Sequence, residues 1–540
     1  MGATRFGAIT IGLGLAGALA TSPAHSESGS DAEIALLKQQ LKMLEQKIDK
    51  LQKQSDANAA TAAAANAHAK AADAKAADAK TVANANAALP VKGPVAASGV
   101  VVSMPNNRPT ICTADDQNCI AITGRIHYDV GGYRYRPDTA ATTPQKLDNG
   151  ENLRRARIGI TGKFLSDWNF ALIYDFGGSS DGFGGTGAAG AAPVGFLPGG
   201  QTSGVENAYL SYTGFKPFGG KMAIEGGVMD LLWTMDESTS SNDILFMERA
   251  SAGIIAQNIA AGDFRSAFGS RWWNDQLWVG GYVTGPTSGS IHSASSVIPA
   301  GTSEQYGGVV RAAGNPINGK DYSVHIGADA EWLIQPPRNL VTQAQTLTLS
   351  DRPELRIDPT TLISTGAIAN VSGAQVYGVE AAATYGSFIA QGEYYWFNID
   401  RTANTGLPPF GAPSLKFDGG YAQVGYVLTG ETHAYNPATA SYGGIKPANP
   451  VSFAGGGWGA WEIAGRVSQM NLNDQLATAA GIAGGRQTVY TAALNWYVTG
   501  NVRFMLDYLH GTISKQASAI STVDAGSKFD AVALRTQVAW

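Results

Sequence analysis

The C-terminal part of the chain, residues 488–540, alternates apolar and polar side chains in three successive runs. In the second run Phe504 and Leu506 lie on one face, whereas Arg503 and Asp507 lie on the other. Successive side chains of a β-strand point to opposite faces, so this period of two predicts strands. The pattern recurs from about residue 120 onward without helical periodicity. It is typical of an outer-membrane β-barrel, whose wall has an apolar face toward lipid and a polar face toward water.

We predict an all-β transmembrane barrel of 16 antiparallel strands. Their connections alternate between short turns, such as residues 165–166 and 386–387, and long loops, such as residues 177–204 and 401–416. An even number of strands, with short turns at one rim and long loops at the other, is the pattern of bacterial outer-membrane barrels. The predicted strands are residues 120–128, 153–163, 168–176, 205–212, 222–228, 264–273, 277–283, 306–312, 322–332, 375–385, 388–397, 421–428, 458–468, 488–498, 502–509 and 529–540.

Three connections depart from this pattern. Residues 429–457 are long for a periplasmic turn, so the strand count could differ by two. Residues 230–262 combine charges of both signs with apolar stretches, which favours a loop folded into the barrel lumen over a solvated loop. Residues 336–365 form the longest other insertion.

The first hundred residues have a different composition. A charged residue, an apolar run and small residues predict a signal peptide over residues 1–24. Residues 25–55 are predicted to form a coiled coil, with a lone amphipathic helix as the alternative, and an Ala-rich low-complexity linker follows over residues 56–100. The barrel domain is residues 101–540. The apolar positions of the heptads are Ile34, Leu37, Leu41, Leu44, Ile48 and Leu51.

Composition supports this division. The chain has 67 glycines, 20 tyrosines and only 15% charged residues, which fits one large turn-rich β structure better than a string of enzyme domains. Cys112 and Cys119 lie seven positions apart, and in an exported protein a small disulfide loop is favoured over a free pair. Metal binding is disfavoured because the nearest histidine, His127, has no companion. No cofactor is expected.

Eight short motifs follow one another over nearly the whole barrel. They are Leu153-Arg154-Arg155-Ala156-Arg157, Val205-Glu206-Asn207-Ala208-Tyr209, Glu248-Arg249-Ala250, Arg352-Pro353-Glu354, Gly392-Glu393-Tyr394-Tyr395, Leu428-Thr429-Gly430-Glu431, Trp461-Glu462-Ile463-Ala464-Gly465-Arg466 and Leu494-Asn495-Trp496-Tyr497. Together these motifs resemble the phosphate-selective porin O and P family of Gram-negative outer membranes. This resemblance implies a homotrimer of 16-stranded barrels, each with its own channel narrowed by the third loop. It also implies an arginine ladder in the constriction, which Arg154, Arg155 and Arg157 match in part.

The solute does not follow from the resemblance. The third loop carries Glu237 and Asn242 in an acidic stretch where phosphate-selective members are basic, and residues 101–540 hold 28 Lys and Arg against 35 Asp and Glu. The inward arginines either coordinate passing anions or pair with acidic loop residues and only shape the field of the pore. The pore-lining candidates are Arg154, Arg155, Arg157, Glu237, Asn242, Arg249, Glu393, Arg466, Arg503 and Arg535.

We therefore expect an outer-membrane porin for passive diffusion of small hydrophilic solutes or ions, with anions such as phosphate as one option, and not an enzyme. The alternatives are a tether, in which the periplasmic coiled coil reaches the cell wall and contacts peptidoglycan, and an outer-membrane hydrolase. Three enzyme-like strings, at residues 178–182, 182–187 and 314–320, lack the strand-turn-helix or phosphate-loop context that their chemistry needs. The expected partners are solutes, outer-membrane lipids and identical subunits, with no nucleic acid.

Overall fold

The computed structural model describes residues 99–138, 146–177, 204–262, 265–287, 303–339, 342–402 and 414–540. In the N-terminal part it describes Lys42, Gln46, Asp49, Gln52 and Lys53, which are helical and exposed. The chain divides into two units, Met1–Val95 and Ala96–Trp540. The predicted signal peptide, the apolar positions of the coiled coil and almost all of the linker lie outside the described residues.

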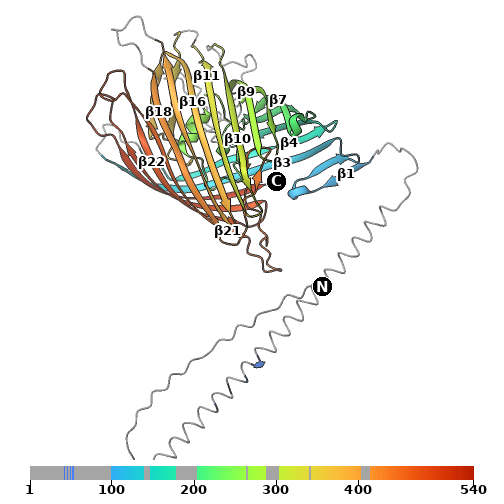
Figure 1. Ribbon diagram of the computed structural model, residues 1–540. Coiled ribbons are helices and arrows are strands. Elements are labelled where there is room, and N and C mark those ends of the chain that lie inside the picture. The colour runs from blue at the N-terminus through green and yellow to red at the C-terminus, as the bar shows by residue number, and fades with distance from the viewer. Residues whose placement is uncertain are drawn as a thin grey trace, which may run out of the picture. The chain divides into compact units, whose positions relative to one another are not determined.

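Sixteen antiparallel strands form a closed barrel, so the predicted architecture and strand number are confirmed (Figure 1). The barrel closes where the last strand pairs with the first along thirteen residues, from Ser527 opposite Pro137 to Ala539 opposite Arg125. The strands are β3 (Cys119–Pro137), β4 (Gly150–Phe164), β5 (Trp168–Asp175), β6 (Gly204–Tyr212), β7 (Lys221–Met229), β8 (Arg265–Trp273), β9 (Leu277–Thr287), β10 (Tyr306–Asn318), β11 (Tyr322–Gln335), β16 (Val371–Tyr385), β17 (Phe388–Arg401), β18 (Leu415–Val427), β21 (Ala460–Asp474), β22 (Ile482–Tyr497), β23 (Val502–Ser514) and β24 (Ser527–Ala539).

Several strands extend beyond their predicted ends. β3 continues to Pro137, nine residues past the predicted end at residue 128, and β18 begins at Leu415 rather than at residue 421. In β3 the extension contains Gly131 and Gly132, and in β18 it contains Gly419 and Gly420. Glycine adds no side chain to the alternation, so the sequence pattern stops there although the backbone pairing continues.

A short hairpin precedes the barrel and was not predicted. It consists of β1 (Val100–Ser103) and β2 (Thr110–Thr113), joined through a 3₁₀ turn, η1 (Pro105–Asn107). β2 pairs with the beginning of β3, which sets Cys112 directly opposite Cys119. The two residues are joined there as a cross-strand disulfide.

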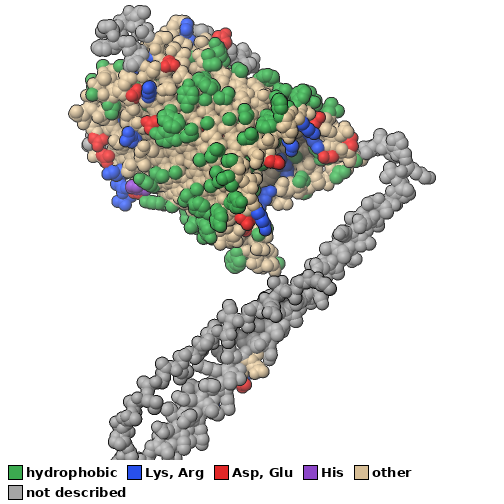
Figure 2. All heavy atoms as spheres, viewed as in Figure 1, with side chains coloured by type: hydrophobic (Ala, Val, Ile, Leu, Met, Phe, Trp, Pro, Cys, Tyr) green, Lys and Arg blue, Asp and Glu red, His purple; other side chains and the backbone are tan. Residues whose placement is uncertain are grey.

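The outer face of the barrel is apolar over its middle (Figure 2). Outward side chains such as Leu172, Val279 and Leu506 are about half exposed. At the short-turn rim Trp461, Trp496 and Phe504 stack, with ring centroids 5.2 and 5.6 Å apart. Aromatic girdles of this kind mark the interface between membrane and water. Among the residues that the structure describes, no helix is long and apolar enough to span a membrane.

Three connections fill much of the lumen. Loop 230–264 enters from the long-loop rim, as predicted, and carries the short helices α2 (Met235–Ser238) and α3 (Ser251–Gln257), both buried. Insertion 336–370 contains the strand pairs β12 (Thr346–Leu347) with β15 (Ile368–Ala369), and β13 (Ser350–Asp351) with β14 (Ile363–Ser364). Its Leu355 and Leu362 are buried.

The third connection, turn 428–459, enters from the opposite rim. The sequence indicated only that it is long for a periplasmic turn, whereas the structure shows that its hairpin, β19 (Tyr435–Asn436) with β20 (Ser441–Tyr442), lies inside the barrel. Ala440 is fully buried, and Ser441 and Tyr442 are at most 4% exposed. A second 3₁₀ turn, η2 (Pro217–Gly219), connects β6 to β7 at this rim.

Candidate pore constriction

Three neighbouring arginines of β4 enter the lumen, and a β-bulge makes this possible. On β3, Arg125 lies opposite Arg157 and His127 lies opposite Arg155. The next residue of β3, Tyr128, pairs with Leu153. The register thus skips Arg154, which has no partner on β3. A bulge turns two adjacent side chains toward one face. Arg154 and Arg155 are accordingly 2% and 1% exposed, whereas strict alternation would have turned Arg154 toward lipid.

These arginines have different partners. The Nε and Nη2 atoms of Arg154 donate to the Glu248 carboxylate at 2.8 and 3.0 Å. Arg157 donates from Nε to Asp175 at 2.7 Å and also binds Glu206. The Nε and Nη1 atoms of Arg155, by contrast, have no hydrogen-bond partner among the described residues. Buried guanidinium nitrogens without a protein partner are costly unless water or a bound anion satisfies them.

Glu248 of loop 230–264 lies at the centre of a wider arginine cluster. Arg535 of β24 donates to Glu248 at 2.7 Å and to both carboxylate oxygens of Asp129 at 2.7 Å. Arg356 of insertion 336–370 approaches Glu248 to 3.9 Å. Burial alone would raise the pKa of Glu248, but the surrounding arginines outweigh it and hold that pKa well below its ordinary value. Glu248 is therefore ionised at neutral pH.

Wall carboxylates hold the loop backbone. The amide nitrogens of Met235 and Asp236 donate to Glu380 and Glu393 at 2.6 and 3.0 Å. On other sides of the lumen, the amide of Met247 donates to Asp507 and that of Ala260 donates to Glu331, both at 2.9 Å. Each of these carboxylates satisfies a loop amide that would otherwise be buried without an acceptor.

Wall cations and amides hold the loop carbonyls in the same way. Arg503 donates to Ile244 O at 2.9 Å, and Arg466 donates to Glu248 O at 2.8 Å. Asn495 donates to Leu245 O at 2.9 Å. These contacts bind the main chain of the loop to side chains of the barrel wall.

The remaining candidates lie within the loop. Arg249 donates to the carbonyls of Asp236 and Thr239 at 3.1 and 2.8 Å, and its Nε lies 3.3 Å from carboxylate oxygens of Asp236 and Glu237. Burial raises the pKa of Asp236, and the Arg249 guanidinium opposes that rise. The Oδ1 atom of Asn242 lies 3.0 Å from Nε2 of His127.

Two cavities flank the cluster around Glu248. The inner cavity, about 160 Å³, is lined by Arg125, Arg155, Arg157, Arg249, Glu206, Asp230, Glu237, Asn207 and the hydroxyls of Ser238, Ser240 and Ser241, among others. The outer cavity, about 410 Å³, lies toward the long loops and is lined in part by Arg265, Arg352, Arg356 and Asp351. Arg155 lines the inner cavity and Arg356 the outer one, and both are close to Glu248.

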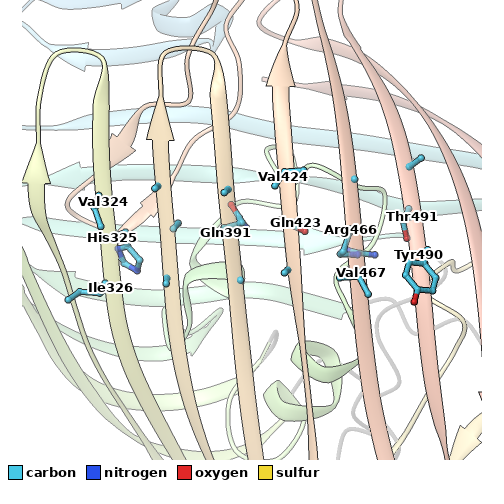
Figure 3. A pocket seen from close by; sticks show the side chains of 18 of the residues that line it. Val324, His325, Ile326, Gln391, Gln423, Val424, Arg466, Val467, Tyr490 and Thr491 are labelled. Carbon is cyan, nitrogen blue, oxygen red and sulfur yellow. The ribbon is translucent and has the colours of Figure 1, made fainter.

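A third hollow lies on the outside of the barrel wall. It has a volume of about 910 Å³ and forms where outward positions on β16–β18, β21 and β22 are occupied by alanine or glycine. Figure 3 shows the two faces of this wall: Val324, Val424 and Val467 belong to the outward set, whereas His325, Gln423 and Arg466 are buried on the lumen side. The hollow lies on the outer face of the wall and is separate from the constriction.

The structure brings Arg154, Arg155, Arg157, Glu237 and Arg249 to one region of the lumen. Glu393, Arg466, Arg503 and Arg535 are buried at other points along loop 230–264, where they hold it. The sequence did not single out Asp129 or Arg356 for the site and gave Glu248 only as part of a family motif. Its signal was a charged pair, Glu248-Arg249, in a stretch from Ile244 to Ala256 whose other residues, Ser251 apart, are apolar or glycine.

Comparison with known proteins identifies the family. The model of the family "Phosphate-selective porin O and P" matches residues 120–540. Porin O of Pseudomonas aeruginosa is 22% identical over 434 residues, which cover 75% of this chain and 85% of that protein. An uncharacterized protein of Caulobacter vibrioides is 32% identical over 280 residues, and the chain spans half the length of that relative. The outer membrane protein OmpT of Vibrio cholerae superposes with a TM-score of 0.43 at 11% identity, covering 79% of this chain and 98% of that one. With a family match over the whole closed barrel, the chain belongs to the phosphate-selective porin O and P family and is an outer-membrane porin.

Proposed function

We propose that this porin is a passive diffusion channel for small anions, which pass the constriction by binding Arg155. The observation that carries the proposal is the buried Arg155 side chain, whose Nε and Nη1 atoms have no partner among the described residues although the residue lines the inner cavity. A guanidinium can replace the hydration of an anion with charge-assisted hydrogen bonds.

The distribution of wall charge supports the same proposal. Arg125, Arg155 and Arg157 lie on neighbouring strands β3 and β4, whereas Glu380 lies on β16 across the barrel. Opposed charges across a water-filled passage create a transverse field, which separates the paths of anions and cations. The serine hydroxyls of the inner cavity add neutral hydrogen-bond partners that do not repel an anion.

Carboxylates of the wall and of the loop limit this preference for anions. Glu206, Asp230 and Glu237 also line the inner cavity, so an anion in it meets both signs of charge. We therefore expect weak anion selectivity, with oxyanions such as phosphate among the solutes, rather than exclusion of cations.

Reversal potentials in asymmetric potassium chloride test the proposal. Replacing Arg155 with Gln keeps hydrogen-bond donors but removes the charge, and we expect a shift toward cation selectivity. Arg136→Gln is the matched control, because Arg136 is 42% exposed on the same strand as Arg125 and pairs with Asp530 outside the constriction. Equal reversal potentials for Arg155→Gln and wild type, in channels that insert normally, would contradict a role for Arg155 in permeation.

We also infer that three copies assemble in the outer membrane, with the N-terminal coiled coil in the periplasm. Closed walls leave no edge strand from which unfolding can begin, so the oligomer should resist SDS until it is heated. Migration that boiling leaves unchanged, together with a monomer mass in detergent, would argue against the trimer.

A further inference from the structure

The carboxylate of Glu248 is surrounded by guanidinium groups, as a bound anion would be. Two arginines donate directly to its carboxylate: Arg154 at 2.8 and 3.0 Å and Arg535 at 2.7 Å. Arg356 lies at 3.9 Å, and Arg155 adds a further positive charge nearby. Four guanidinium groups around one carboxylate resemble the surroundings of a bound phosphate or sulfate more than those of a simple ion pair.

The neighbouring carboxylates do not neutralise this cluster. Asp129 is bound by Arg535, and Asp351 binds Arg356 at 2.9 Å, so these two acids offset two of the four arginines. Glu248 offsets a third. Among these seven groups one positive charge remains, and Arg155, whose Nε and Nη1 atoms have no hydrogen-bond partner within the described part of the chain, lines the inner cavity.

Glu248 lines neither cavity, but it lies next to one arginine of each. Arg356 lines the outer cavity and Arg155 the inner one. An anion that moves from the first arginine to the second meets the guanidinium groups that Glu248 already occupies. Conduction between adjacent ion sites requires that each site also release its ion.

We propose that Glu248 is a tethered counter-anion, built into the channel, which competes with the transported oxyanion for the arginine cluster and sets both the affinity and the anion preference of the constriction. The inference rests on the proposed anion channel and names its specificity-determining residue. As a consequence, the Glu248 carboxylate displaces a passing anion from the arginines. Without this competition the anion would bind the arginines too tightly to be released.

The test measures block of the chloride current by inorganic phosphate in single channels. Glu248→Gln keeps the size of the side chain and frees the guanidinium groups from a carboxylate. We expect phosphate to bind on the order of ten times more tightly, which corresponds to about 1.4 kcal/mol, and the reversal potential to move in the anion direction.

Glu225→Gln is the matched control. Glu225 of β7 is also buried and binds an arginine, Arg271, at 3.1 Å, and the substitution removes one carboxylate away from the arginine cluster around Glu248. We expect its phosphate affinity to stay within about two-fold of wild type. If both substitutions changed the phosphate affinity equally, Glu248 would act only through the total charge of the lumen, and the inference would be wrong.

A second substitution covers a failure of Glu248→Gln to insert. Glu248→Asp keeps the charge but withdraws the carboxylate by one methylene group, and intermediate tightening of phosphate binding is expected. Phosphate block identical to wild type in Glu248→Asp would contradict tethered competition. A wild-type channel that excludes chloride would instead refute the proposed anion channel, independently of what Glu248 does.

Discussion

Glu354 connects insertion 336–370, in which it lies, to loop 230–264 and to wall strand β21. Substitution of Glu354 therefore tests how much this connection contributes to the stability of the constriction. The Glu354 carboxylate accepts hydrogen bonds from Ser251 N of loop 230–264 at 3.0 Å, from Arg466 Nη2 at 2.8 Å and from Ser468 Oγ at 2.5 Å. The backbone of Glu354 has φ 53°, in the left-handed region that costs residues other than glycine about 1 kcal/mol. These contacts offset that cost.

Glu354→Ala should be strongly destabilising because it leaves Arg466 buried without its carboxylate. The side chains of Arg466 and Glu354 are 3% and 1% exposed. Removal of one partner from a buried ion pair costs about 3–5 kcal/mol, whereas replacement of both partners by apolar groups is often neutral. The double variant Glu354→Ala with Arg466→Met should therefore lose less stability than Glu354→Ala alone.

The assay is the free energy of unfolding from lipid vesicles, measured together with single-channel conductance. We expect higher and noisier conductance for Glu354→Ala, because insertion 336–370 and loop 230–264 lose their shared anchor. The thermodynamic coupling should be at least about 1.5 kcal/mol. Additive losses in the double variant, or an unchanged conductance in Glu354→Ala, would refute the account of a shared anchor.

Two further predictions concern turn 428–459 and the inner cavity. Burial opposes protonation of His433, but Glu462 and the Gly443 carbonyl raise its pKa above 6.5, so charged His433 stabilises the turn. This contribution is complete below pH 6.5 and is lost as the pH rises through the raised pKa, and His433→Gln should remove that part of the pH dependence of unfolding. Glu237→Lys with Asn242→Lys should shift the reversal potential toward anions at low salt and less at high salt, because salt shortens the Debye length. A shift of equal size at both salt concentrations would argue against an electrostatic origin.

Alternation of side chains was sufficient to predict the barrel and all sixteen of its strands. Each wall strand has an apolar outer face and a polar inner face along its length, so the period of two recurs in every strand. It was not sufficient for the β1–β2 hairpin, whose four-residue strands are too short for a period to be recognised. The position of turn 428–459 was missed for a different reason. Its burial depends on partners far away in the sequence, such as Arg311, which donates to Ala440 O at 2.7 Å.

The sequence predicted which arginines enter the candidate site, but it did not predict which carboxylates they bind. Sequence placed Arg155 and Arg157 on one inward face, and the bulge that adds Arg154 has no local signal. The two interpretations of the arginines, solute binding or pairing with acidic residues, concern different residues. Arg154 and Arg157 bind carboxylates, whereas Arg155 keeps two nitrogens without partners among the described residues and is the one proposed to bind solute.

The seam between β3 and β24 constrains how the protein is made. Thr123 Oγ1 donates to Trp540 O at 3.1 Å across 417 residues of sequence, and Gly124 lies so close to the Trp540 ring that a side chain there would clash. Closure of so long a chain segment carries a large entropic cost and comes late in folding. Until β24 has paired with it, β3 exposes an open edge to other chains. A chain truncated within β24 would leave that edge permanently unpaired and open to aggregation.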